Sequence, residues 1–412
     1  MNAYDPLLSR RQLLRGAVGG MGLNVARRMG LPFLFSQAAL ANAASDSKRQ
    51  RILVIFELSG GNDGLNTVVP YADDTYYKLR PNIGIKPQKV RKIDDHFGFS
   101  PGMAGFERLY KDGKLAIIHG CGYDNPSFSH FTSMAYWHTA APNSGEPYGW
   151  VGRLADAMQP EPSANFIVNI DTTQSLAVRS RFHTPVVFDD PDKFTRNAFF
   201  DEKPMLAQVS QSDAGTNPAR RYLLDVARSA QDASVLVRDA WGKYKSPIDY
   251  GIVPLHLPKV AALIQAQMPT QLYYVAYRNN AFDTHVQQGD LHQRLLTYAS
   301  DAVSGFMRDL ERIGRAEDVT MMIFSEFGRR APENTSLGTD HGAANVMFMV
   351  GSNVKGGHYG TVPSLTALDP GDNLAYTTDF RRVYATAMSG WLGFNDTASV
   401  LRGQFEPFPI FA

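Results

Sequence analysis

Short apolar runs separated by polar loops recur along the chain from residue 51 onward. Uninterrupted apolar runs of this length are typical of strands that are buried on both faces of a sheet. The expected strands are 51–58, 115–120, 166–170, 185–188, 272–277, 319–325 and 346–350. The pattern therefore predicts a single buried sheet.

Between these runs, apolar residues recur at helical spacing. The expected helices are 130–139, 218–245, 290–313 and 379–392. Strands that alternate with helices predict an α/β fold with a mostly parallel central sheet and helices on both faces. We interpret residues 51–412 as one domain and residues 191–250 as an insertion or cap within it.

The first 43 residues resemble an export signal. Arg10 and Arg11 match the twin-arginine pattern of bacterial signal peptides, which is an address and not a membrane anchor. A glycine-rich, moderately apolar stretch follows, and Ala41-Asn42-Ala43 fits a small-residue cleavage site. We therefore expect residues 1–43 to be a signal peptide and the protein to be periplasmic or secreted. A basic amphipathic N-terminal helix is the other interpretation.

Charge and cysteine content exclude several classes of partner and site. The formal net charge is +1, and the first 43 residues hold five arginines against one aspartate, so the rest is mildly acidic. Such a body does not attract nucleic acids by bulk electrostatics. Cys121 is the only cysteine, which rules out an intrachain disulfide and a thiolate metal cage. No apolar run long enough for a membrane span follows the N-terminus.

The densest cluster of reactive side chains lies between two expected strands, at 319–325 and 346–350. An open α/β sheet places its chemistry at the C-terminal ends of its strands. Glu326 could bind a metal or act as a general base, or it could form an ion pair with Arg329. Arg329 is also a candidate catalytic residue. His341 is a candidate metal ligand. Asp340 could bind the same metal or orient the His341 ring.

Asp283 and His285 follow the expected strand 272–277 after a short polar turn. In extended backbone, residues two apart point to the same side, so both side chains could meet one divalent ion. A carboxylate oxygen and an imidazole nitrogen suit zinc or manganese. The alternative is a hydrogen-bonded pair that only shapes the loop.

Two acids lie near the first expected strand. Glu57 is inside an apolar run, so it should be buried, and a buried carboxylate needs a partner or a metal. Asp63 follows a glycine-rich loop. It could bind metal, or it could cap and brace that loop.

Hydroxyl groups gather before the expected helix 130–139. Ser127 and Ser129 are candidate nucleophiles if a base or a metal activates them, and candidate N-caps if nothing does. Because a helix N-terminus offers free N–H groups, this region also suits an anion such as phosphate or sulfate. Asn62 and His130 are the candidate anion-binding side chains.

Several of these motifs, in this order along the chain, resemble one bacterial family. They are Gly60-Gly61-Asn62-Asp63-Gly64-Leu65-Asn66, Ser129-His130-Phe131, Phe282-Asp283-Thr284-His285, Ser325-Glu326-Phe327-Gly328-Arg329 and Gly338-Thr339-Asp340-His341-Gly342. Together they resemble domain-of-unknown-function family 1501, from about residue 50 to the C-terminus. Members of that family typically carry twin-arginine signals and are sulfatase-like.

The resemblance implies an alkaline phosphatase-like fold and a bound divalent metal, which could be zinc, manganese, calcium or magnesium. It also implies a hydrolase of small-molecule or polymer phosphate or sulfate esters. The sulfatase nucleophile motif lacks its cysteine and arginine here, and Phe327 replaces a metal-binding histidine. These departures favour the alternative, a non-catalytic binding or assembly protein of the cell envelope with a secreted partner protein.

Overall fold

The computed structural model describes residues 50–163, 165–194, 224 and 233–411. The expected export signal at 1–43 and much of the expected insertion at 191–250 lie outside the described residues. The described residues from Arg51 onward belong to one compact unit, and this second unit of the chain contains the predicted sheet. Within the described ranges, no helix is long and apolar enough to cross a membrane.

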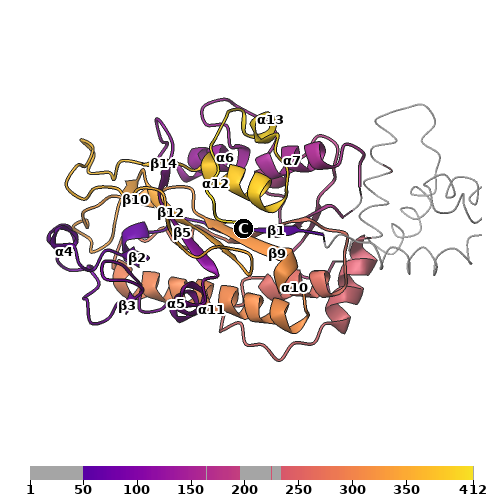
Figure 1. Ribbon diagram of the computed structural model, residues 1–412, viewed down its shortest axis with the longest axis horizontal. Coiled ribbons are helices and arrows are strands. Elements are labelled where there is room, and N and C mark those ends of the chain that lie inside the picture. Colours follow the sequence, from indigo (N-terminus) through magenta and orange to yellow (C-terminus); the bar gives the residue numbers. More distant parts are fainter. Residues whose placement is uncertain (1–49, 164, 195–223, 225–232, 412) are drawn as a thin grey trace, which may run out of the picture. The chain divides into compact units, whose positions relative to one another are not determined.

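A nine-stranded sheet forms the centre of this second unit (Figure 1). Its strands are β1 (Ile52–Leu58), β5 (Leu115–Gly122), β6 (Ile167–Ile170), β7 (Val186–Phe188), β8 (Leu272–Tyr277), β9 (Val319–Phe324), β12 (Asn345–Gly351), β13 (Gly357–Tyr359) and β14 (Thr378–Asp379). Their order is β13-β5-β12-β9-β1-β8-β6-β7, and β14 also pairs with β5. Only β12 runs antiparallel to its neighbours β5 and β9. The predicted mostly parallel sheet is confirmed.

Helices cover both faces of this sheet, as predicted (Figure 1). On one face lie α6 (His130–Thr139), α7 (Trp150–Met158), α12 (Arg381–Ala385) and α13 (Thr397–Leu401). On the other lie α5 (Ala104–Lys111), α10 (Leu257–Gln265) and α11 (Gln288–Arg312). Each face has its own apolar core, because successive side chains along a strand point to opposite sides. In β1, Val54 and Phe56 belong to the α11 side, whereas Leu53 and Ile55 belong to the α6 side.

The predicted elements agree with the observed ones to within two residues, except near the C-terminus. The predicted helix 379–392 begins with α12 and continues as a π-helix, Thr386–Trp391. Within the predicted helix 218–245, the described residues 224 and 233–243 are helical. Shorter elements complete the described fold. They are β2 (Val68–Val69), β3 (Arg91–Lys92), β4 (Gly98–Phe99), β10 (Gly328–Arg329), β11 (His341–Gly342), α4 (Asp74–Leu79) and the 3-10 helices Gly64–Asn66, Leu176–Val178 and Ala316–Asp318.

The strand order brings the predicted motifs to one edge of the sheet. The parallel neighbours β8, β1 and β9 all end at this edge, and so does β5, which leads into α6. Because β12 runs the opposite way, it begins here, and the β10–β11 hairpin before it pairs Arg329 with His341. Loops from distant parts of the chain therefore meet at a single place.

The loop after β1 needs glycine at two positions. Gly60 has φ +118° and Gly61 has φ +74°, a region that favours glycine. A Cβ atom at Gly60 would lie 2.6 Å from the backbone nitrogen of Asp283. A Cβ atom at Gly61 would lie 2.2 Å from the Phe327 ring. The glycines therefore allow three loops to approach closely.

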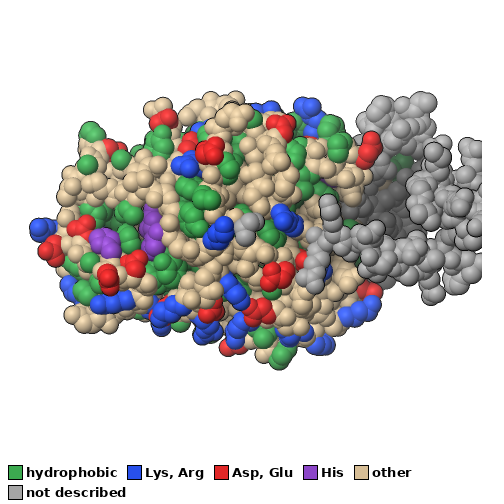
Figure 2. Space-filling model, in the orientation of Figure 1, with side chains coloured by type: hydrophobic (Ala, Val, Ile, Leu, Met, Phe, Trp, Pro, Cys, Tyr) green, Lys and Arg blue, Asp and Glu red, His purple; other side chains and the backbone are tan. Residues whose placement is uncertain are grey.

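Acidic and basic side chains are interspersed on the face that Figure 2 shows. A nucleic acid would find no continuous basic surface there, in agreement with the small net charge.

We expect Gly60→Ala to lower the free energy of unfolding by about 2–4 kcal/mol, from backbone strain and overpacking together. Gly113→Ala is the control. Gly113 also has a positive φ of +71°, but nothing lies within 4 Å of its added Cβ, so it should cost about 1 kcal/mol. Urea unfolding followed by circular dichroism measures both. Equal losses would show that the close approach at Gly60 carries no cost of its own.

Candidate functional site

Four side chains converge at the shared edge of the sheet. Asp283 and His285 come from the loop after β8, His341 from β11, and His130 from the start of α6. The Nε2 atoms of His285 and His341 lie 2.9 and 3.2 Å from Asp283 Oδ1. His130 Nε2 lies 3.3 Å from Asp283 Oδ2. Every histidine therefore presents the same ring nitrogen to one carboxylate.

The opposite nitrogen of each ring faces an oxygen. His130 Nδ1 lies 2.8 Å from Glu326 Oε1, and His341 Nδ1 lies 2.7 Å from the carbonyl oxygen of Phe128. A carboxylate or carbonyl oxygen can only accept, so both Nδ1 atoms carry a proton, and in the neutral form of each ring Nε2 has the lone pair. His285 Nδ1 lies 3.5 Å from Asp340 Oδ1. Such outer partners fix the tautomer of histidines that bind metal.

Two observations fit a cation at this place. His130 Nε2 is buried without a hydrogen-bond partner, which is costly for a polar atom that binds nothing. His285 Nε2 and His341 Nε2 lie 2.9 Å apart, and two facing lone pairs repel unless a proton or a cation lies between them. Ligand atoms of His130, Asp283 and His341 all lie within 4.8 Å of one another. Imidazole nitrogens with one carboxylate suit zinc or manganese better than calcium or magnesium.

Asp283 stays ionised over a wide pH range. Burial alone would raise its pKa, but the neighbouring Arg329 and His341 side chains outweigh burial and lower the pKa of Asp283 to about 2. A hydrogen bond to Glu326 raises the pKa of His130, whereas burial lowers the pKa of His341. The cluster therefore keeps one permanent negative charge.

Arg329 clamps the loops around the cluster. Its side chain is fully buried, and its Nε donates to Gly61 O at 2.6 Å. Its other nitrogens donate to the carbonyl oxygens of Gly60, Phe282 and Thr339 and to Asp283. Every nitrogen of the Arg329 guanidinium group is hydrogen-bonded to the protein, so no donor is left for the catalytic role expected of Arg329. The ion pair that Arg329 was expected to form with Glu326 is instead formed with Asp283.

Glu326 is a buried support for His130. It accepts hydrogen bonds from Gly60 N at 2.9 and 3.1 Å and from Ser325 Oγ at 3.0 Å. Phe327, the next residue, packs its ring against His130 and His341, with centroids 4.9 and 4.5 Å apart. Glu326 therefore orients the His130 ring, and Phe327 forms an apolar wall beside the cluster.

Asp63 and Asn62 lie apart from the cluster. Asp63 is buried and pairs with Arg80 at 2.6 Å, and it also accepts from Asn66 N. These contacts give Asp63 the loop-bracing role that was one of its two possible roles from sequence. Because its carboxylate pairs with Arg80, Asp63 is not part of the candidate metal-binding cluster. Asn62 bonds to His292 Nε2 at 2.9 Å instead of facing an anion. Asp340 lies beside His285 Nδ1 and not beside His341, whereas orienting the His341 ring was one of the roles that the sequence suggested for it.

Neither candidate nucleophile has a base. Ser127 Oγ accepts from Ser129 N at 3.3 Å, and Ser129 is the N-cap of α6 without a side-chain cap bond. Among the described residues, no histidine or carboxylate is hydrogen-bonded to either hydroxyl. His130, expected to contact an anion, instead joins the cluster. These serines therefore lack the activation that a nucleophile requires.

Glu57 finds partners that sequence reasoning missed. It lies on the α6 side of β1, and its Oε2 is 2.8 Å from His138 Nε2. Tyr274 from β8 donates to the same oxygen and lies 2.8 Å from His138 Nε2. The sequence offers little indication that His138 lies near the site. The one link is its position eight residues after His130 on the same helix.

A cleft of about 250 Å³ connects the two groups. It is lined by Glu57 and His138 on one side and by His130 and Glu326 on the other. Glu57 is thus not a ligand of the cluster but part of the adjacent cleft.

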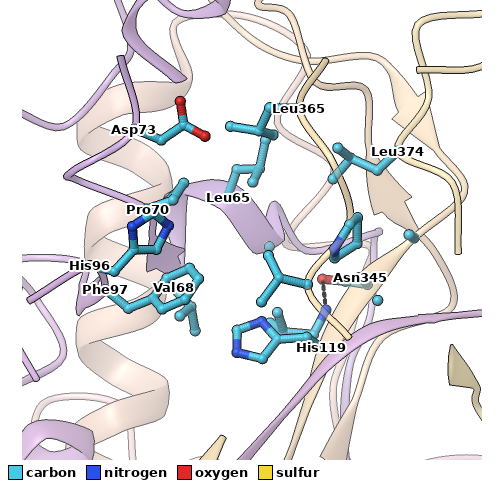
Figure 3. A pocket seen from close by; sticks show the side chains of 16 residues that line it. Leu65, Val68, Pro70, Asp73, His96, Phe97, His119, Asn345, Leu365 and Leu374 are labelled. Atoms are coloured by element: carbon cyan, nitrogen blue, oxygen red, sulfur yellow. Dashed lines mark hydrogen bonds between the residues drawn. The ribbon is translucent and has the colours of Figure 1, made fainter. Parts of the chain in front are cut away.

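A second pocket, of about 60 Å³, lies elsewhere and is mostly apolar (Figure 3). His119 lines it, and burial, together with the neighbouring His358, lowers the pKa of His119 to about 3. His119 Nε2 lies 2.7 Å from His358 Nδ1. None of the sequence-predicted site residues lines this pocket.

Residues 265–399 match the model of a family described as "Protein of unknown function (DUF1501)". The chain is similar to this family over those residues. The matched segment contains Asp283, His285, Glu326 and His341, whereas the glycine loop and His130 lie before it. The match is therefore shorter than the resemblance expected from about residue 50 to the C-terminus. Among proteins with curated descriptions, none matches this chain significantly.

Several solved structures of low sequence identity are similar to this chain. One is a protein in the alkaline phosphatase superfamily from Vibrio parahaemolyticus (9% identity, TM-score 0.36, covering 78% of this chain and 65% of that one). Another is the PsFucS1 sulfatase from Pseudoalteromonas sp. (11%, 0.38, covering 91% and 75%). A third is the C-terminal periplasmic domain of EcEptC from Escherichia coli in complex with Zn (10%, 0.33, covering 74% of each).

We expect Asp63→Asn to lower the free energy of unfolding by about 3–5 kcal/mol at pH 7, because Arg80 would remain buried without its partner. Burial opposes ionisation of Asp63, but Arg80 and His292 outweigh it and hold its pKa below the ordinary value of 3.8. The contribution is therefore present above pH 3.8 and lost as the pH falls through the lower folded pKa.

Urea unfolding at a series of pH values measures this difference. Asp239→Asn is the control, because the Asp239–Lys243 pair is exposed and should change stability little at any pH. A loss for Asp63→Asn that does not shrink in acid would contradict the assignment to the ionised pair.

Proposed function

We propose that this chain is an exported, metal-dependent hydrolase of phosphate or sulfate esters, and that His130, Asp283, His285 and His341 hold the metal. The observation that carries the proposal is the common orientation of the three histidines. Each ring turns Nε2 to the Asp283 carboxylate while Nδ1 faces Glu326, Asp340 or the Phe128 carbonyl. A packed, purely structural cluster has no need of three imidazole nitrogens that point at one carboxylate.

The chain's own residues supply the rest of the site. When bound, a divalent ion is a Lewis acid that polarises and neutralises the ester's oxygens. Asp283 provides the permanent negative charge, and Glu326 keeps the His130 lone pair directed at the cluster. Arg329 fixes the positions of the loops that carry these residues. Because Ser127 and Ser129 lack a base, we propose water as the nucleophile.

One observation favours a second function, a non-catalytic binding or assembly protein of the cell envelope. Phe327 fills the position of a metal-binding histidine in the resemblance, and its ring covers His130 and His341. A site with one metal and an apolar wall could bind an anionic partner without cleaving it. This alternative shares the metal site with the hydrolase, so only a test of catalysis separates the two.

We expect the purified protein to bind one equivalent of zinc or manganese and His341→Ala to bind none, because a ligand is lost. Glu326→Gln should bind metal about 10–100-fold more weakly, since it alters the outer partner of His130 and removes no ligand. Calorimetric titration with each metal measures this. His96→Ala is the control, because His96 is exposed and does not belong to the cluster. Unchanged binding in His341→Ala would exclude the proposed ligand set.

We expect the metal-loaded protein to hydrolyse 4-nitrophenyl phosphate or 4-nitrophenyl sulfate, and EDTA to abolish the reaction until metal is restored. His285→Ala should lose the activity while keeping its fold, because His285 is partly exposed. Release of 4-nitrophenolate is the measurement. A protein that binds metal stoichiometrically and cleaves neither ester would support the non-catalytic alternative instead.

A further inference from the structure

The cleft beside the cluster contains a second histidine–carboxylate pair that the proposed metal chemistry does not use. His138 lies two turns after His130 on α6, and both line the cleft. His130 is held through Nδ1 by Glu326, and His138 is held through Nε2 by Glu57. The two rings are therefore anchored by opposite nitrogens.

The anchoring of His138 leaves one nitrogen for a ligand. Its Nε2 lies 2.8 Å from both Glu57 Oε2 and the Tyr274 hydroxyl, which are directed toward the sheet. Its Nδ1 is on the other edge of the ring, and no described residue is hydrogen-bonded to it. Because the residue is only 9% exposed yet lines the cleft, Nδ1 is the polar atom that His138 can offer there.

This arrangement suits a group that holds and releases a proton. Tyr274 is buried and its pKa is raised, so it keeps its proton and donates it to Glu57. The Glu57 carboxylate then accepts from His138 Nε2–H, in either protonation state of the ring. A carboxylate behind an imidazole fixes the tautomer and stabilises the imidazolium, which frees the far nitrogen for proton transfer.

We propose that this cleft binds the alcohol part of the ester and that His138 Nδ1 protonates its leaving oxygen. The inference rests on the proposed hydrolysis. Water forms the new bond to phosphorus or sulfur, the bond to the alcohol oxygen breaks, and the proton on Nδ1 moves to that oxygen. The proton lost by the attacking water passes to solvent, and solvent returns one to His138, so the overall reaction is hydrolysis to acid and alcohol.

The lining of the cleft also defines the class of alcohol. Phe131, Met134 and Leu176 form an apolar wall, and Phe131 is 89% exposed. Among the described residues that line the cleft, none is lysine or arginine, whereas two are glutamates. A neutral alcohol with an apolar face fits this surface, and a polyanionic leaving group would be repelled by the carboxylates.

The experiment compares leaving groups in the metal-loaded full chain. Phenyl phosphate and phenyl sulfate need a proton on their leaving oxygen, and the 4-nitrophenyl esters do not. We expect His138→Gln to lower kcat/KM for the phenyl esters about 100-fold and for the 4-nitrophenyl esters less than about threefold. Metal stoichiometry should stay at the wild-type value in this variant.

Two further variants keep the test decisive. Glu57→Gln preserves volume and should lower the phenyl to 4-nitrophenyl rate ratio in the same direction, even if His138→Gln folds poorly. His183→Gln is the control. This histidine is similarly buried and bonds to Gln159 O, so it reports the general cost of losing a buried imidazole. Its rate ratio should equal that of the wild type.

The outcomes separate the two proposals. Equal losses on both ester types, or no loss on either, would show that His138 is structural and would overturn this inference while hydrolysis stands. A wild-type protein that cleaves neither ester would overturn the proposed function and this inference with it.

Discussion

A buried guanidinium group holds the candidate site together. Arg329 donates hydrogen bonds to carbonyl oxygens of the β1 loop, of the β8 loop and of the segment before β11. A buried charge is tolerated only when its hydrogen bonds are satisfied, and here the nitrogens of one side chain bond to all three loops. The same residue pairs with Asp283, so the charge that orients the loops also keeps the central carboxylate ionised.

Sheet topology explains why the loops come within reach of that arginine. The parallel strands β8, β1 and β9 all end at one edge, whereas β12 starts there because it runs in the opposite direction. His341 can therefore precede its strand and still face Asp283, which follows another. The close approach requires Gly60 and Gly61, since side chains at these positions would overlap the neighbouring loop and the Phe327 ring.

Much of this could be predicted from sequence, because local patterns specify local structure. Apolar runs located the strands, and the Asp283–His285 spacing predicted that both side chains face one point. The outer partners could not be predicted, because they depend on contacts across the fold. Glu326 supports His130 across 196 positions, and Glu57 meets His138 across 81. Two roles stayed open for Asp63, metal binding and bracing of the glycine loop, because nothing in the sequence reveals that Arg80 occupies its carboxylate.

Glu57 has a consequence for the stability of the whole sheet. It occupies a central strand, between β8 and β9, at a position where its neighbours on the same face are Leu53 and Ile55. Replacing a buried charged pair by well-packed apolar residues is often neutral or stabilising. A strand under selection for folding alone would have no reason to keep a carboxylate there. The proposed role of His138 would explain why this core keeps an acid at the expense of some folding free energy.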